Sequence, residues 1–186
     1  MSANLNLKKT VFLDRDGTLI VDKVYLNDPD QIEYLPDVFA ALRLLRDEGF
    51  QFVVVTNQSG IARRLVTLEN LDETHRRIQA EFSRHGVHFN GFYYAPYSVE
   101  SNHPIRKPHP GMLLRGALDH RADLSKSWMV GDRLTDVIAG SRAGCRTVLL
   151  AGVEGVDPSL DAEAQPTKFT HGLLEAAHAI VRLSSR

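Results

Sequence analysis

Short apolar runs alternate with amphipathic stretches along most of the chain. The runs Thr10–Leu13 and Phe50–Thr56 are almost continuously hydrophobic, which is typical of parallel strands that are covered on both faces. Three similar runs follow at Gly91–Ala95, Ser127–Val130 and Arg146–Leu150. The pattern therefore predicts five strands of a parallel sheet.

Helical spacing of apolar residues fills the intervals between these runs. The longest stretch begins at Thr67, a good N-cap, and His75 on its apolar stripe is expected to pack in the core rather than to bind a ligand. The expected helices are Pro36–Gly49, Thr67–Gly86, Gly111–Asp119, Thr135–Ala143 and His171–Leu183. Strands that alternate with helices predict an α/β, Rossmann-like three-layer fold, with helices on both faces of the sheet.

Three stretches lack a periodic pattern. We expect a flap at about residues 17–34, whose polar, irregular part is Val21–Tyr34, to cover the end of the first strand. The segment Pro96–Pro110 and the tail Gly152–Pro166 are expected to be loops. At 186 residues the whole chain, 1–186, is expected to form a single domain.

Composition narrows the function classes. The net charge of −1 lacks the basic excess of a general nucleic-acid or anionic-membrane binder, so we expect neither partner. No stretch approaches membrane-spanning length, and Met1–Lys9 lacks the apolar core of a signal peptide. One cysteine, Cys145, rules out an intrachain disulfide framework and fits a reducing compartment, where we expect it to be a packed thiol. A cytoplasmic monomer is expected.

Charged residues appear where the first buried strand should end. Asp14 and Asp16 follow Thr10–Leu13 directly, and Gly17 lets the backbone turn away. In an open α/β sheet, ligands bind outside the carboxyl ends of the strands, so both carboxylates are expected at a binding crevice. Taken alone, such a D-x-D-G motif is more often an ordinary turn.

Three other strand ends carry polar groups as well. They are Thr56 and Asn57 after the second strand, Arg106 and Lys107 after the third, and Asp132 after the fourth. Each has an ordinary interpretation as a turn, a solvated pair or a helix cap. Because the carboxyl ends of parallel strands share one edge, the set brings together three carboxylates, a hydroxyl, an amide and two cations. Such a set suits a hard cation and a phosphate.

This inventory of side chains suggests a mechanism. Asp14, Asp16 and Asp132 can bind Mg²⁺, which offsets their mutual repulsion. Asp14 can then attack phosphorus and form an aspartyl-phosphate, while Thr56 and Lys107 hold the phosphoryl oxygens. Asp16 is placed to protonate the leaving oxygen and later to deprotonate the attacking water. The sequence thus predicts a magnesium-dependent hydrolase of phosphate monoesters.

Four motifs over about residues 10–150 match a known family. They are Asp14–Thr18, Thr56–Arg63, Arg106–Met112 and Gly131–Arg133, with the sequences DRDGT, TNQSGIAR, RKPHPGM and GDR. The chain resembles the haloacid-dehalogenase (HAD)-like phosphatases, and within them the D-glycero-D-manno-heptose 1,7-bisphosphate phosphatases and their histidinol-phosphatase relatives. The first and last motifs are typical of the superfamily, and the two central motifs are more specific to this branch.

The resemblance adds expectations about the pocket. It implies that Arg106 recognises the distal phosphate of the substrate, and that further substrate contacts come from Asp22, Tyr25, Asn57, Gln58, Ser59 and Arg133. It agrees with the roles given above to Asp14, Asp16, Thr56, Lys107 and Asp132. A large cap domain is not expected, so the flap and the loop Pro96–Arg106 are left as cover.

The chain departs from these relatives in one loop. Relatives commonly carry zinc-binding cysteines before R-K-P, whereas this chain has Ala95-Pro96-Tyr97 and His103-Pro104-Ile105 in the altered region of about 95–107. Because the thiolates of a tetrahedral zinc site are missing, we expect no structural zinc.

The expected function is removal of the 7-phosphate of heptose 1,7-bisphosphate, on the way to lipopolysaccharide or a capsular polysaccharide. One alternative is a phosphatase for histidinol phosphate or another small phosphorylated metabolite. An alternative of another class is an inactive binding module that keeps the fold, although all four motifs retain competent side chains.

Overall fold

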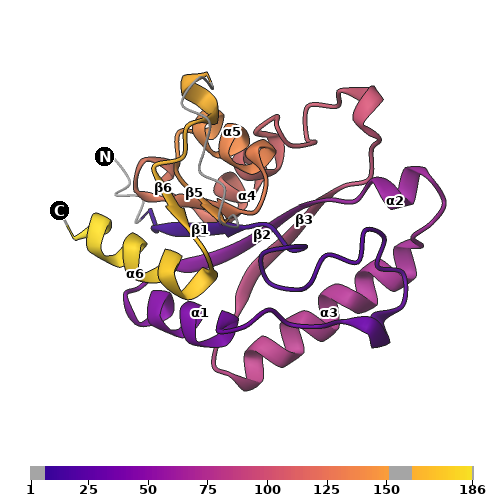
Figure 1. Cartoon of the computed structure of the whole chain (residues 1–186), viewed down its shortest axis with the longest axis horizontal. Helices are drawn as coiled ribbons and strands as arrows, with labels where there is room; N and C mark the ends of the chain where they lie inside the picture. The colour runs from indigo at the N-terminus through magenta and orange to yellow at the C-terminus, as the bar shows by residue number, and fades with distance from the viewer. Residues whose placement is uncertain (1–6, 151–160, 186) are drawn as a thin grey trace, which may run out of the picture.

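A computed structural model describes residues 7–150 and 161–185 of the chain (Figure 1). Six parallel strands form one sheet in the order β3-β2-β1-β4-β5-β6. The strands are β1 (Thr10–Leu13), β2 (Gln51–Asn57), β3 (Phe89–Ala95), β4 (Trp128–Gly131), β5 (Arg146–Leu150) and β6 (Lys168–Thr170). The first strand therefore lies inside the sheet, between β2 and β4, which carry two of the other three expected polar ends.

The register aligns these strand ends. Leu13 pairs with Val54 of β2 and with Val130 of β4. The amide of Asp14 then donates a hydrogen bond to the carbonyl of Val130 at 2.9 Å. The residues that follow β1 and β4 consequently leave the sheet side by side.

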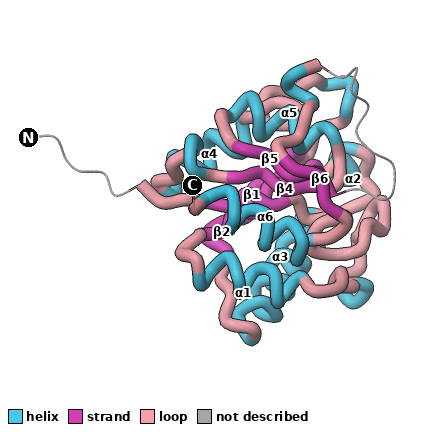
Figure 2. The backbone as a smooth tube through the Cα atoms, turned by 60° about the vertical axis from the view of Figure 1, so that its left-hand side comes forward, coloured by secondary structure: helices cyan, strands magenta, loops and turns pink. Residues whose placement is uncertain are grey.

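Helices cover both faces of the sheet. On one face lie α1 (Val38–Asp47), α3 (Leu68–Arg84) and α6 (Leu173–Ser184), and on the other α4 (Gly111–His120) and α5 (Leu134–Ala143), as Figures 1 and 2 show. A short helix, α2 (Ser59–Ala62), follows β2. Single 3-10 turns occupy Pro29–Gln31, Val99–Ser101, Leu124–Lys126 and Ala162–Ala164. None of the helices in the described ranges combines the length and the hydrophobicity needed to cross a bilayer.

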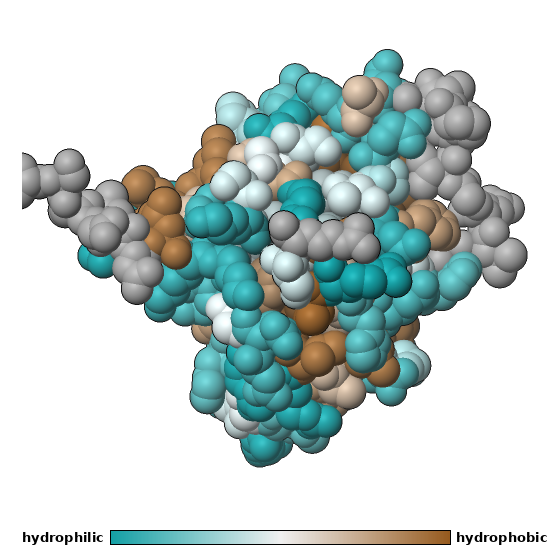
Figure 3. Space-filling view, turned by 90° about the vertical axis from the view of Figure 1, so that its left-hand side faces the viewer, coloured by the Kyte–Doolittle hydropathy of each residue, from teal (hydrophilic) through white to brown (hydrophobic). Residues whose placement is uncertain are grey.

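The core has two halves because alternate residues of each strand point to opposite faces. Val11 and Leu13 pack with the buried faces of α1, α3 and α6, whereas Phe12 packs with α4 and α5. The surface over the ends of α1 and α6 is mainly hydrophilic, with hydrophobic residues in small separate groups (Figure 3). Both faces of the sheet are thus buried, as the continuous apolar runs predict.

The α/β fold, the five expected strands and the five expected helices are confirmed, with shifted ends. The first helix begins at Val38 rather than Pro36, because Asp37 before it has a left-handed backbone with φ 61°. Leu68 is 49% exposed and does not join the buried stripe of α3, whereas His75 is buried as expected.

Two short elements were not expected from the sequence, β6 and α2. The predicted loop Gly152–Pro166 falls largely on residues 151–160, and most of the segment Met1–Lys9 falls on residues 1–6. Both of those ranges lie outside the described residues.

Candidate active site

A pocket of about 330 Å³ opens where the carboxyl ends of the strands meet the flap. It is lined by Asp14, Asp16, Asp22, Val24, Tyr25, Thr56, Asn57, Ser59, Val99, Arg106, Lys107, Arg133 and Thr135. All the predicted site residues line it except Gln58 and Asp132. Both of these contact or neighbour lining residues, Gln58 through Asp16 and Thr56 and Asp132 beside Asp14. Residues from four connections thus come together as the shared sheet edge predicts.

Lys107 forms the cationic centre of the site. Its ammonium lies 2.9 Å from Asp14 Oδ1 and 2.6 Å from Asp136 Oδ1, and it donates to the carbonyl of Val55 at 2.8 Å. Burial opposes its positive charge, but Asp136 and Asp14 outweigh that effect and raise the pKa of Lys107. A permanent positive charge therefore lies against one oxygen of Asp14.

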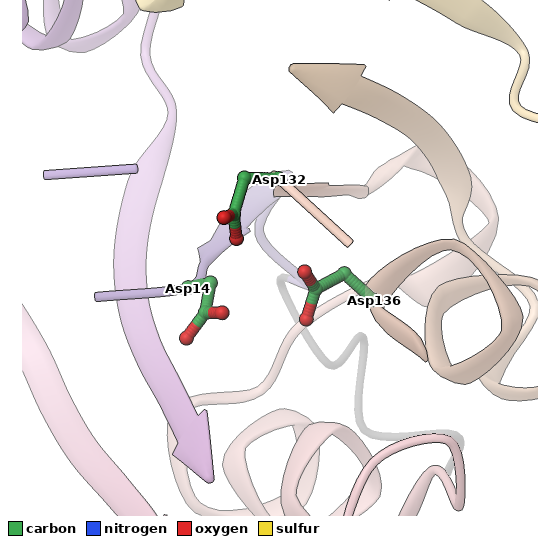
Figure 4. A group of neighbouring side chains, drawn as sticks. All are labelled: Asp14, Asp132 and Asp136. Carbon is green, nitrogen blue, oxygen red and sulfur yellow. The ribbon is translucent and has the colours of Figure 1, made fainter. Parts of the chain in front are cut away.

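Three carboxylates face one another beside this lysine. Asp14 follows β1, Asp132 follows β4 and Asp136 lies in the first turn of α5, and one oxygen of each lies within 4.8 Å of the others (Figure 4). Burial raises the pKa of Asp14 to about 6, with Lys107 opposing and Asp136 adding to the shift. Burial, Asp14 and Asp136 raise the pKa of Asp132 to about 7. The cluster concentrates negative charge that a cation would neutralise.

The donor set fits a hard divalent cation. Asp132 Oδ1 is buried, and among the described residues it has no hydrogen-bond partner. An unpaired buried carboxylate oxygen is costly, and Mg²⁺ prefers ligands of this type. Across residues 7–150 and 161–185 this is the one group of three or more His, Cys, Asp or Glu side chains close enough to share an ion.

The carboxylate of Asp16, which the sequence predicts as a metal ligand, is not part of this group of three, whose third member is Asp136. The Asp16 carboxylate accepts three hydrogen bonds from Arg15, one from Nε at 3.1 Å and two from Nη2 at 2.8 and 2.9 Å. It also accepts one from Gln58 Nε2 at 2.9 Å. Burial raises the pKa of Asp16, while Arg15 opposes the shift. Asp16 nevertheless lines the pocket.

Gln58, which was expected to contact the substrate, does not line the pocket. Its side chain is buried and donates to Thr56 Oγ1 at 2.9 Å as well as to Asp16. Thr56, at the end of β2, has its hydroxyl 3.5 Å from Asp16 Oδ2. Gln58 therefore orients two residues of the lining from behind.

Asn57 fixes the loop that delivers Lys107. Its side-chain amide donates to the carbonyl of Lys107 at 3.0 Å, and its oxygen accepts from the Lys107 amide at 3.0 Å. This reciprocal pair joins the end of β2 to a residue fifty positions later. Asn57 thus lines the pocket and also sets the position of the lysine backbone.

The mouth of the pocket is cationic. Arg133 forms an ion pair with Asp22 of the flap at 2.7 Å. Burial lowers the pKa of Arg106, Glu100 opposes this shift, and the nearby charges of Arg133 and Arg63 add to it. Two guanidinium groups that line the same pocket favour binding of an anion there.

Asp136 was not identified from the sequence. Its second oxygen accepts from the amide of Arg133 at 3.0 Å and so caps the start of α5. An acidic residue three positions after a strand-end cap is a normal helix-start pattern, which gives no sign of the second contact with Lys107. Nothing in the local pattern places that lysine opposite it.

Comparisons with known proteins agree with this geometry. A family model described as HAD-hydrolase-like matches residues 104–176. The chain is 35% identical over 185 residues to the D-glycero-beta-D-manno-heptose-1,7-bisphosphate 7-phosphatase of Vibrio cholerae, covering 95% of this chain and 98% of that one. It is 40% identical over 147 residues to the enzyme of the same name from Escherichia coli, covering 75% and 77%.

A solved structure is similar over nearly its whole length. It is the D,D-heptose 1,7-bisphosphate phosphatase from B. bronchiseptica complexed with magnesium and phosphate, with a TM-score of 0.82 and 28% identity. The match covers 94% of this chain and 99% of that chain.

Proposed function

We propose that this chain, which belongs to the HAD-like phosphatases, hydrolyses the 7-phosphate of heptose 1,7-bisphosphate through an aspartyl-phosphate. The observation that carries this proposal is the pairing of a buried carboxylate, Asp14, with Lys107 and a metal-type carboxylate cluster at the base of a pocket with a cationic mouth. The named substrate of the relatives carries two phosphates, which suits a site with charge at both ends.

The proposed magnesium site consists of Asp14 and Asp132, with Asp136 as the third nearby carboxylate. When bound there, Mg²⁺ would offset the negative charge of the phosphate and of the carboxylates. The residues fit this role because the Asp132 Oδ1 lone pairs are otherwise unused within the described residues.

Asp14 is the proposed nucleophile. Lys107 holds one of its oxygens at 2.9 Å, which leaves the other oxygen to attack phosphorus. As the new bond from oxygen to phosphorus forms, the bond from phosphorus to the sugar oxygen breaks, and Asp16 donates a proton to that leaving oxygen. The raised pKa of Asp16 supports a protonated acid in this step.

The second step regenerates the site. Asp16, now ionised, takes a proton from a water molecule as the water oxygen attacks phosphorus. The bond from phosphorus to Asp14 breaks and inorganic phosphate leaves. Thr56, whose hydroxyl is held by Gln58, is proposed to bind the phosphoryl oxygens in both steps.

The mouth of the pocket is proposed to bind the second phosphate. Arg106 and Arg133 line it from two different loops, and Tyr25 and Ser59 offer hydroxyl groups on its walls. The pocket is complete within one chain, so we propose that the monomer is active. The buried free thiol of Cys145 fits a reducing compartment, and we place the reaction in the cytoplasm.

A substrate panel tests the proposal. Phosphate release is measured with heptose 1,7-bisphosphate, heptose 7-phosphate, histidinol phosphate and 4-nitrophenyl phosphate, each with Mg²⁺ and with EDTA. We expect the highest kcat/KM for the bisphosphate and no turnover in EDTA. Similar values for the bisphosphate and the monophosphates would contradict the substrate, and full activity in EDTA would contradict the metal site.

Asp14→Asn adds a test of the chemistry itself. It should abolish turnover and leave the fold intact, since the amide keeps the shape but is not a nucleophile. Asp47→Asn, a change on the exposed end of α1 away from the pocket, is the matched control and should be fully active.

A further inference from the structure

The loop before Lys107 is held by an aromatic stack. The rings of Tyr97 and His103 lie 3.7 Å apart between centroids and are inclined by 12°. Both side chains are half-buried. Because nearly parallel rings at this distance fix both side chains, the two ends of the loop are joined face to face.

The same two residues also hold Arg106. Its guanidinium Nη1 donates to the carbonyl of Tyr97 at 2.9 Å, and its backbone amide donates to the carbonyl of His103 at 2.8 Å. Arg106 is thus bonded at its side chain by one partner of the stack and at its backbone by the other. Separating the rings would separate the two anchors of this arginine.

Neighbouring contacts set the orientation of the stack. His103 Nδ1 accepts from the amide of Ile105 at 3.3 Å, which fixes the ring plane. Tyr97 and Ile105 pack against the core under α4 and α5. His109 Nε2 lies 2.7 Å from Asn102 Oδ1, a contact that joins residues on either side of His103. The stack is therefore fixed to the scaffold on one side and to Arg106 on the other.

We propose that Tyr97 and His103 are positioning residues that hold the Arg106 guanidinium at the pocket mouth. They do so in the loop where the sequence lacks the cysteines of a zinc site. This inference rests on the proposed function, in which Arg106 binds the distal phosphate. The stack touches no part of the reacting phosphate, so it should affect binding of the bisphosphate and leave the chemical step unchanged.

The test compares kcat and KM for heptose 1,7-bisphosphate and for 4-nitrophenyl phosphate. His103→Ala should raise the KM for the bisphosphate by about two- to twelvefold, the range expected for loss of one stacked pair, with kcat little changed. The KM for 4-nitrophenyl phosphate should not change. His103→Phe keeps a ring for stacking and should restore the KM to within about twofold, since the ring rather than its nitrogen holds Tyr97.

Further variants separate the possible outcomes. Tyr97→Leu removes the stack from the other side and should repeat the effect of His103→Ala, and His88→Ala, at an exposed histidine elsewhere, is the control. The double variant His103→Ala/Arg106→Ala should be no worse than Arg106→Ala alone, because the stack acts through that arginine. Thermal unfolding of each variant checks that the fold is retained.

Suppose that Arg106→Ala raises the KM for the bisphosphate alone, and that His103→Ala and Tyr97→Leu leave it unchanged. This result would overturn the positioning role and leave the proposed function standing. Equal losses on both substrates in Arg106→Ala would contradict the distal-phosphate site itself, and the positioning role would fall with it. Stoichiometric zinc in the purified protein would show that a metal, and not the stack, holds the loop.

Discussion

Asp132 reaches the carboxylate cluster by lying against the backbone of Gly17. A Cβ atom at position 17 would meet Asp132 Oδ2 at 2.2 Å, and Gly17 has a φ of +74° that other residues rarely adopt. Gly17→Ala should therefore displace Asp132 and weaken the proposed magnesium site. We expect kcat/KM to fall by on the order of 100-fold, as for other displacements of about 1 Å in an active site, together with a weaker dependence of rate on Mg²⁺ concentration.

Gly49→Ala is the matched control for that change. Gly49 has a similar φ of +80°, but its nearest neighbour in that direction is Lys9 Cε at 3.7 Å. Both substitutions should cost about 1 to 2 kcal/mol of unfolding free energy through the backbone. Equal activity in the two variants would refute the contact between position 17 and Asp132 as the reason for the glycine.

His75 supports the site from behind. Its Nε2 lies 3.4 Å from Arg15 Nη1, and its ring stacks on Phe92 with centroids 4.8 Å apart. Burial and the charge of Arg15 lower the pKa of His75 to about 3. His75 is therefore neutral in the folded protein and can accept a hydrogen bond from Arg15. Arg15 in turn holds Asp16.

This lowered pKa predicts a pH-dependent stability. In the unfolded chain a histidine titrates near pH 6.5, so below that value the unfolded state binds a proton that the folded state does not. Folding stability from His75 is present above about pH 6.5 and is lost towards pH 3, by up to about 1.4 kcal/mol per pH unit. His75→Gln keeps an acceptor without the titration, so urea unfolding from pH 7 to pH 4 should give a flatter curve than for the wild type.

His88→Gln, at an exposed histidine elsewhere, is the matched control for this substitution. If His75→Gln and His88→Gln had the same pH dependence as the wild type, His75 would not be held neutral by the fold.

Residue types at strand ends could be predicted from the sequence, but their partners could not. Asp14, Thr56, Lys107 and Asp132 follow from position alone, because each lies at or beyond the carboxyl end of a strand. The contact between Lys107 and Asp136 joins residues from different connections and has no local pattern. The partner of Asp16 also could not be predicted from the local sequence. Its carboxylate pairs with the buried side chain of its neighbour Arg15 and is not part of the carboxylate cluster.

At the scale of elements, the flap is joined to the start of α5. The Asp22 and Arg133 side chains, 29% and 64% exposed, form an ion pair at 2.7 Å. Asp22 also accepts a hydrogen bond from the amide of Val24 at 2.7 Å, and Val24 has an uncommon φ of 66° for a β-branched residue. The pair therefore fixes the part of the flap that lines the pocket.

A double-mutant cycle tests the Asp22–Arg133 ion pair with 4-nitrophenyl phosphate as substrate, which has no distal phosphate. Asp22→Asn and Arg133→Gln should each raise the KM by up to about fivefold, the range for a partly exposed ion pair, and the double variant should be no worse than either. Lys23→Gln breaks the exposed ion pair with Glu33 inside the flap and should have no effect. Additive losses in the double variant would exclude a direct coupling.

Elements with a clear period could be predicted, and short ones could not. The strand β6 has three residues, Lys168–Thr170, which is too few for an apolar alternation to be distinguished from a loop. Its pairing with β5 at the sheet edge, and not its sequence, makes it a strand. The helix α2 has four residues and follows directly from the end of β2, where the motif is read more readily as a turn.

At the scale of the whole molecule, strand order explains why distant residues share one site. The order β3-β2-β1-β4 places β1 between the two strands whose ends carry Thr56 and Asp132. The alternation of strands and helices predicts a parallel sheet, and in a parallel sheet the carboxyl ends of the strands share one edge. The order of the strands itself needs long-range packing, which no local pattern contains.

The carboxylate cluster links this site to the stability of the whole fold. Burial and neighbouring carboxylates raise the pKa of Asp14 to about 6 and that of Asp132 to about 7, above the ordinary value of 3.8. Without metal, the folded state therefore holds protons that the unfolded state has released, and their contribution to stability is lost as the pH rises through 6 to 7. A divalent cation offsets this loss of stability at higher pH, because it binds the ionised carboxylates.

Mg²⁺ should consequently stabilise the protein more at pH 8 than at pH 5.5. At a concentration of about 100 times its dissociation constant it should add about 2.7 kcal/mol to the free energy of unfolding at pH 8, and clearly less at pH 5.5, where protons compete for the same oxygens. Urea unfolding in EDTA and in Mg²⁺ at both pH values measures the difference. Asp132→Asn removes one titrating ligand and should abolish most of it, whereas Asp47→Asn should not. An equal gain from Mg²⁺ at both pH values would mean that the metal does not bind at the Asp14 and Asp132 carboxylates.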